Sequence, residues 1–224
     1  MTTFTDTFKR VIVPINQEGY NIIIIAAIIT VLLAMISKTV GFFAFVILLF
    51  IIYFFRCPVR VMPDSENAIL APADGIVDKI EKVAPPEELE LDNTKEWTRV
   101  SIFLSVFNVH VQRIPFDGKV AKLNYRPGKF LNVSVDKYSK DNERQSVVLE
   151  TKDGKLIPFV QIAGLIARRI VCDLNIGDEV KKGDIYGIIK FGSRVDIYLP
   201  EGIEPLVKVG QTMLGGESII ANMQ

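Results

Sequence analysis

The chain has 224 residues, which fits one domain of ordinary size plus an appendage. Its 26 basic and 26 acidic residues cancel, so the composition indicates neither a nucleic-acid-binding excess of positive charge nor an acidic, disordered tail. The two cysteines, Cys57 and Cys172, form no Cys-x-x-Cys pair, and a single histidine, His110, is too few for a zinc hydrolase. We therefore expect no metal site, and we expect cysteines that suit a reducing compartment.

The first expected elements are two apolar helices. Ile22–Ile36 is apolar except for Thr30, and Val40–Phe55 is apolar throughout. Each run makes about 23 Å of helix, which is short against a hydrocarbon core of about 30 Å. A single long tilted helix would bury Lys38 of the linker at a cost, so we favour a tight hairpin that dips into or just crosses a bilayer. A core hairpin of a soluble protein is the third interpretation, although neither run has a polar face.

The charges that flank these runs favour one orientation. Lys9 and Arg10 precede the first run, Arg56 and Arg60 follow the second, and the linker holds only Lys38. The excess of positive charge on cytoplasmic segments then predicts that both flanks lie in the cytoplasm. A cleaved signal peptide is disfavoured because no small-residue cleavage site closes the first run.

Composition changes after residue 56, which divides the chain into a membrane-anchoring segment, 1–56, and a β-rich domain, 57–224. The hairpin signal Lys152-Asp153-Gly154-Lys155 separates two apolar runs. Ile162–Val171 is predicted as a strand or a short helix. Many short strands between turns indicate a flattened barrel or sandwich. The expected strands are Ala68–Leu70, Gly75–Val83, Arg99–Phe103, Lys119–Leu123, Ser146–Thr151, Leu156–Ile162 and Val195–Leu199.

A weak internal repeat sharpens the fold prediction. Apolar strands and glycine-bearing turns recur in similar order in segments that begin at Ile69, Asn175 and Val209. This pattern is similar to lipoyl and biotinyl carrier domains, which are barrel-sandwich hybrids. A carrier needs an exposed lysine at a hairpin tip, often beside methionine, and Lys181-Lys182 has no adjacent methionine. The similarity therefore concerns shape and not carrier function.

Several separate motifs occur in order along the chain. They are Tyr53–Arg56, Ala71–Gly75, Phe103–His110 with Pro115, Asn142–Arg144, Gln161–Gly164, Ala167–Ile170 and Phe191–Arg194. On these residues the chain resembles the phosphatidylserine decarboxylase family in its short bacterial form, from about Pro14 to the C-terminus. Some long forms carry a second histidine three residues after the first, where this chain has Arg113.

The resemblance implies a proenzyme that cuts itself between Gly192 and Ser193. The products would be a β chain, 1–192, and an α chain, 193–224, with Ser193 converted to a covalent pyruvoyl cofactor. That group would serve as electron sink for decarboxylation of phosphatidylserine to phosphatidylethanolamine. The expected partners are phosphatidylserine in the bilayer and the second chain of the same precursor, with a homo-oligomer possible. The expected location is the cytoplasmic face of the bacterial inner membrane.

The resemblance also implies a triad. A serine hydroxyl needs a base, and His110 is the one imidazole in the chain. Asp74 matches the family's aspartate and would hold that imidazole in the right tautomer. We assign His110 the return of a proton to the substrate as well. From the residues alone, Asp74 could equally be an Asp-Gly turn residue, His110 a buried core histidine and Ser193 a turn serine.

Three arginines are candidates for the anionic groups of the substrate: Arg144 first, then Arg113 and Arg194. Each could instead be a solvated surface charge. Two other functions stay open. One is a decarboxylase of a related serine phospholipid, and the other is a membrane-tethered, lipoyl-like adaptor or binding module without catalysis.

Overall fold

The computed structural model describes residues 13–92, 96–131, 141–165, 169–190 and 192–223. Its contacts divide the chain into two compact units, Met1–Val59 and Arg60–Gln224. Some residues used in the sequence predictions lie outside the described ranges, namely Lys9, Arg10, Ala167, Arg168 and Phe191.

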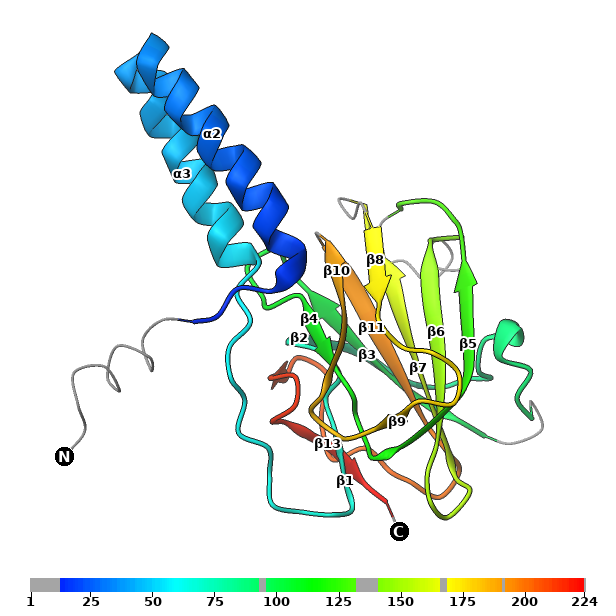
Figure 1. Cartoon of the computed structure of the whole chain (residues 1–224). Helices are drawn as coiled ribbons and strands as arrows, with labels where there is room; N and C mark the ends of the chain where they lie inside the picture. Colours follow the sequence, from blue (N-terminus) through cyan, green and yellow to red (C-terminus); the bar gives the residue numbers. More distant parts are fainter. Residues whose placement is uncertain (1–12, 93–95, 132–140, 166–168, 191, 224) are drawn as a thin grey trace, which may run out of the picture. The chain divides into compact units, whose positions relative to one another are not determined.

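Two apolar helices dominate the first unit (Figure 1). After a 3-10 turn, η1 (Gln17–Gly19), helix α2 spans Tyr20–Ile36 and helix α3 spans Lys38–Phe54. Ser37 separates them in an extended conformation, with φ at −153°. The predicted hairpin is therefore confirmed, although the second helix begins at Lys38, two residues before the expected apolar run.

Small residues bring the two helices of the hairpin together. A Cβ atom added to Gly41 would lie 2.5 Å from the Cα of Ala34, so the backbones approach closely there. Thr30 satisfies its hydroxyl within its own helix by donating to the carbonyl oxygen of Ala26 at 2.7 Å. Gln17–Ile36 is long and apolar enough to cross a membrane. Many large apolar side chains on both helices are exposed, which suggests membrane association.

The second unit consists of antiparallel strands. The largest sheet has eight strands in the order β12-β2-β3-β11-β7-β6-β5-β9, and it curls into a half-barrel (Figure 1). A short 3-10 helix, η2 (Glu87–Leu89), follows β2. The strands are β1 (Ala68–Leu70), β2 (Gly75–Lys82), β3 (Thr98–Leu104), β4 (Val111–Arg113), β5 (Gly118–Arg126), β6 (Arg144–Glu150), β7 (Leu156–Ala163), β8 (Arg169–Cys172), β9 (Glu179–Val180), β10 (Ile185–Lys190), β11 (Ser193–Leu199), β12 (Thr212–Met213) and β13 (Ile219–Asn222).

A three-stranded sheet, β4-β10-β8, packs on the concave side of the large sheet. The Phe159 ring of β7 meets the Tyr186 ring of β10 edge to face, with centroids 5.1 Å apart. Both rings are fully buried in the main core. The strands β1 and β13 form a separate pair. A mainly β fold preceded by apolar helices is thus confirmed.

Two local predictions have different outcomes. The hairpin around Lys152–Lys155 is confirmed, because β6 pairs with β7 and the N–H of Thr151 donates to the carbonyl oxygen of Lys155 at 2.9 Å. The single element predicted over Ile162–Val171 is wrong. Strand β7 ends at Ala163, and β8 begins at Arg169. At Gly164 the backbone leaves β7 and passes close to Gly192, which interrupts the run.

Candidate active site

Ser193 opens β11 in the middle of the large sheet. Its backbone pairs with Leu104 of β3 on one side and with Ala163 of β7 on the other. Strand alternation places Ser193 on the same face as Val195, which packs against Ile189 of the second sheet. The residue is fully buried, and its Oγ has no hydrogen-bond partner among the described residues. Leaving a buried hydroxyl without a hydrogen-bond partner costs free energy of folding. Such an unpaired hydroxyl is typical of a group that reacts.

The carbonyl group before Ser193 is held in a defined position. Gly192 has φ at +45°, a left-handed conformation that favours glycine. Its carbonyl oxygen accepts a hydrogen bond from the N–H of Gly164 at 3.0 Å. A Cβ atom on Gly164 would lie 2.3 Å from that oxygen, so only glycine permits the approach. The peptide bond between Gly192 and Ser193 therefore combines a left-handed backbone that favours glycine with a hydrogen-bonded carbonyl.

His110 is fully buried immediately before β4. Its Nδ1 lies 3.0 Å from the carbonyl oxygen of Asn108. A carbonyl oxygen can only accept, so this contact assigns the ring proton to Nδ1 and leaves Nε2 as the basic nitrogen. The backbone carbonyl of His110 accepts from the N–H of Ile189 at 3.3 Å and from the side chain of Gln112 at 2.7 Å. These contacts connect the histidine to β10, the strand that leads to Ser193.

Asp74 lies in the turn before β2 and is only 6% exposed. Its Oδ1 accepts from the N–H of Gly215 at 2.8 Å, and its Oδ2 lies 2.6 Å from Nη2 of Arg60. The guanidinium of Arg60 also lies 4.0 Å from the Glu217 carboxylate. The sequence predictions treated Arg60 only as a charge that flanks the apolar helices. Its role beside Asp74 was missed because an ion pair between irregular segments leaves no periodic signal.

The backbone neighbours of the three predicted triad residues gather in one small buried cluster. Ala73 precedes Asp74, Leu104 and Ala163 flank Ser193, and Ile189 bonds to the His110 carbonyl. Within the described ranges, no group of three His, Cys, Asp or Glu side chains is placed to hold a metal ion. The structure thus brings the three chain segments to one end of the β unit. The cluster consists of Ala73, Leu104, Ala163, Ile170, Ile189 and Val195.

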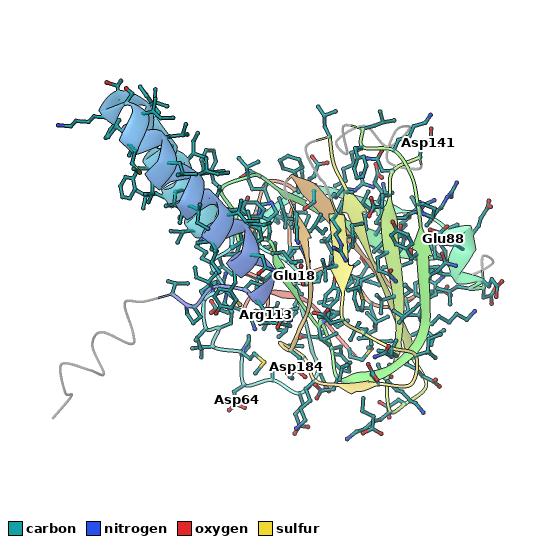
Figure 2. The ribbon with its side chains drawn as sticks, turned by 45° about the horizontal axis from the view of Figure 1, so that its top comes forward. Glu18, Asp64, Glu88, Arg113, Asp141 and Asp184 are labelled. Atoms are coloured by element: carbon teal, nitrogen blue, oxygen red, sulfur yellow. The ribbon has the colours of Figure 1, made fainter. Side chains whose placement is uncertain are left out.

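Two of the three candidate arginines lie on the other face of the large sheet from Ser193. Arg144 of β6 and Arg194 of β11 both pair with Ile162 of β7, so the three side chains form one row, one residue out of phase with Ser193. Arg144 Nε lies 2.8 Å from the carboxylate of Glu88, which Figure 2 labels on η2. The Arg194 guanidinium pairs with Asp196 at 2.9 Å, and both side chains are 1% exposed. The structure does not bring these two arginines to Ser193.

Arg113 occupies a different place. It ends β4, the strand that follows His110, and its Nη1 donates to the carbonyl oxygen of Gly183 at 2.8 Å. Figure 2 labels it near Asp184, whose carbonyl oxygen accepts from the N–H of Ile114 at 2.8 Å. The side chain is partly exposed. Of the three arginines, it is the one in the same sheet as the segment that carries His110.

Comparisons with known proteins all lead to one family. A family model described as phosphatidylserine decarboxylase matches residues 47–221. A phosphatidylserine decarboxylase proenzyme of Rickettsia akari (strain Hartford) is 53% identical over 222 residues, which are 99% of this chain and 94% of the relative. The proenzyme of that name from Rickettsia typhi (strain Wilmington) is 52% identical over the same shares. The one from Ruegeria pomeroyi is 50% identical over 219 residues, 98% of each chain.

Proposed function

The chain belongs to the phosphatidylserine decarboxylase family, and from that premise we propose that it cuts itself between Gly192 and Ser193 and then converts phosphatidylserine to phosphatidylethanolamine. The relatives are named proenzymes, which agrees with a chain that matures by cleavage. The observation that supports self-cleavage best is the buried Oγ of Ser193, next to a Gly192 carbonyl that already accepts a hydrogen bond. This arrangement suits a pyruvoyl group made from Ser193.

The first step is an acyl shift. The Oγ of Ser193 adds to the carbonyl carbon of Gly192, while Nε2 of His110 takes the hydroxyl proton. The carbon–nitrogen bond then breaks, the nitrogen of Ser193 receives a proton, and an ester joins the two residues. Burial of Ser193 and His110 supports this step, because it keeps competing water from the ester.

The second step is elimination. Removal of the α-hydrogen of Ser193 expels the ester oxygen, so Gly192 becomes the carboxylate end of the β chain, residues 1–192. The dehydroalanine left on the α chain, residues 193–224, takes up water and releases ammonia, which leaves a pyruvoyl cap. Atoms balance with one water consumed and one ammonia released.

The side chains have distinct parts in decarboxylation. A pyruvoyl group supplies the electron sink for the electrons that remain when carbon dioxide leaves. His110 returns a proton to the substrate's α-carbon, and Asp74 helps to hold the His110 imidazole in its working orientation. We assign the anionic groups of the lipid to Arg113. Arg144 and Arg194, with carboxylate partners at 2.8 and 2.9 Å, support the sheet on which Ser193 lies.

We propose further that residues 1–56 anchor the chain in the inner membrane and that 57–224 form the catalytic domain on its cytoplasmic face. The exposed apolar hairpin supports the anchor, and Arg56 and Arg60 after the second helix support the orientation. A membrane anchor would keep the site near a substrate that does not leave the bilayer.

Intact-mass analysis of the detergent-purified chain tests the proposal. We expect two fragments, 1–192 and 193–224, the smaller one lighter by the mass of one ammonia than plain hydrolysis would give. Ser193→Ala should remain uncut and release no carbon dioxide from phosphatidylserine vesicles. An adaptor without catalysis would stay whole in both forms. A decarboxylase of a related serine phospholipid would be cut but would leave phosphatidylserine unchanged.

A further inference from the structure

A buried asparagine is connected to the carbonyl of Gly192 through a single peptide group. The side chain of Asn142, fully buried, donates from Nδ2 to the carbonyl oxygen of Ala163 at 2.8 Å. The N–H of Gly164 donates to the carbonyl oxygen of Gly192 at 3.0 Å. The Ala163 carbonyl and the Gly164 N–H belong to the same planar peptide unit. Asn142 and Gly192 therefore bond to opposite ends of one rigid group.

That peptide group has little freedom to rotate. Asn142 follows Asp141, which Figure 2 labels just before β6, and its side chain bonds twice to the backbone of Leu131. Its Oδ1 accepts from the Leu131 N–H at 3.0 Å, which fixes the orientation of the amide. The N–H of Ala163, which belongs to the preceding peptide, donates to the carbonyl oxygen of Glu143 at 2.9 Å and fixes the chain on that side. Turning the Ala163–Gly164 peptide would break its hydrogen bonds to Asn142 and Gly192, each costly to leave unmade.

We propose that the Gly164 N–H stabilises the negative charge on the Gly192 oxygen during self-cleavage, and that Asn142 is the positioning residue for this donor. The inference rests on the proposed self-cleavage. When the Oγ of Ser193 adds to the Gly192 carbon, the carbonyl electron pair moves onto the oxygen. The pair returns when the carbon–nitrogen bond breaks. A donor already aimed at that oxygen stabilises the charged intermediate more than the ground state.

Asn142 adds polarisation to orientation. A hydrogen bond received by the Ala163 carbonyl withdraws electron density from the peptide, which makes the Gly164 N–H a stronger donor. After cleavage Gly192 is a carboxylate end and takes no part in decarboxylation. The role of Asn142 is therefore confined to maturation, whereas a residue needed only for folding would affect maturation and turnover alike.

The test variant is Asn142→Asp in the full-length chain. It keeps an acceptor for Leu131 but presents a carboxylate oxygen to the Ala163 carbonyl. We expect the 193–224 fragment to appear about 10- to 100-fold more slowly after synthesis. Carbon dioxide release per mature chain should be unchanged. Gln145→Glu is the matched control, because that buried amide bonds to the Ser146 carbonyl at 3.3 Å and not to the Ala163–Gly164 peptide. The control should mature at the wild-type rate.

A spectroscopic measurement on the uncut precursor tests the inference without any enzyme activity. Gly192-Ser193 is the one Gly–Ser junction in the chain, and Ser193→Ala creates its one Gly–Ala junction. Carbonyl-¹³C glycine with ¹⁵N alanine then isolates the Gly192 carbonyl resonance, which we expect Asn142→Asp to move to lower frequency. The melting temperature of the same precursor reports folding. If Asn142→Asp melts lower, Asn142→Ser, which also removes the amide donor with less bulk, takes its place.

Three results would overturn the inference. The first is wild-type maturation in a folded Asn142 variant, and the second is an unchanged Gly192 resonance. The third is an equal loss of maturation and of turnover per mature chain. A wild-type chain that stays uncut in the same experiment would overturn the proposed function itself, and this inference with it.

Discussion

The guanidinium of Arg60 lies 2.6 Å from the carboxylate of Asp74, and their side chains are 10% and 8% exposed. The Gly215 N–H bonds to the other carboxylate oxygen. Asp74 is thus oriented by a residue that stands 14 positions earlier in a segment without regular structure. The pair connects the chain just after the apolar hairpin to the turn that precedes β2.

We predict that Arg60→Ala slows maturation by about 10- to 100-fold, because a hydrogen bond to a charged group contributes about 1.5–3 kcal/mol and each 1.4 kcal/mol is about tenfold in rate. The measurement is the rate at which the 193–224 fragment appears. Lys82→Ala is the control, since Lys82 pairs with Glu96 at 2.7 Å with both side chains more than half exposed. Such pairs contribute little. Wild-type maturation in Arg60→Ala would remove Arg60 from the site.

Arg194→Met should reduce stability rather than substrate affinity. The Arg194–Asp196 pair is buried, and removing Arg194 leaves the buried Asp196 carboxylate with a more distant cation, Arg99 at 4.0 Å. We expect a loss of about 3–5 kcal/mol in the free energy of unfolding, measured by urea denaturation of the detergent-purified chain. The double change Arg194→Met with Asp196→Leu should recover much of it. A raised KM with unchanged stability would restore Arg194 as a substrate ligand.

These arginines show where sequence reasoning succeeds and where it stops. Runs rich in β-branched and aromatic residues between turn residues predicted most strands of the large sheet. Separate motifs pointed to Ser193, His110 and Asp74, whose segments the fold brings to one end. The position of Arg194 next to Ser193 in the sequence was misleading for the prediction that Arg194 binds the substrate, because adjacent residues in a strand point to opposite faces of the sheet. The roles of Arg60 and Asn142 arise from contacts with other segments, Arg60 with Asp74 and Asn142 with Ala163. Such contacts leave no regular spacing in the sequence from which they could be predicted.

The apolar hairpin should retain the chain at the membrane through side chains such as Ile28, which is 56% exposed in the middle of α2. We expect Ile28→Asp to release a large fraction of the chain, since an aspartate at the centre of a membrane helix costs about 2.5–3.5 kcal/mol. The measurement is flotation with vesicles. Ile176→Asp changes a side chain that is 67% exposed in the β unit, and it should float like the wild type. Equal flotation of both variants would contradict an anchoring role for α2.

Tyr186 gives a prediction about stability and pH. Its hydroxyl has no hydrogen-bond partner among the described residues, and complete burial raises the pKa of the phenol well above 10.0. Above about pH 10 the unfolded chain ionises at this residue while the folded chain keeps its proton, so the stabilisation present at lower pH is lost as pH rises. Tyr186→Phe keeps the ring contact with Phe159 and removes both the unpaired hydroxyl and the ionisation.

We therefore expect Tyr186→Phe to unfold at a higher pH than the wild type and to be more stable by about 1 kcal/mol at neutral pH. Far-ultraviolet circular dichroism across an alkaline titration, with urea denaturation at pH 7, measures both. Tyr20→Phe changes a phenol that is 54% exposed and should leave the alkaline midpoint in place. An alkaline midpoint that Tyr186→Phe does not move would show that another group controls unfolding at high pH. A loss of stability at neutral pH would show that the hydroxyl has a partner in solution.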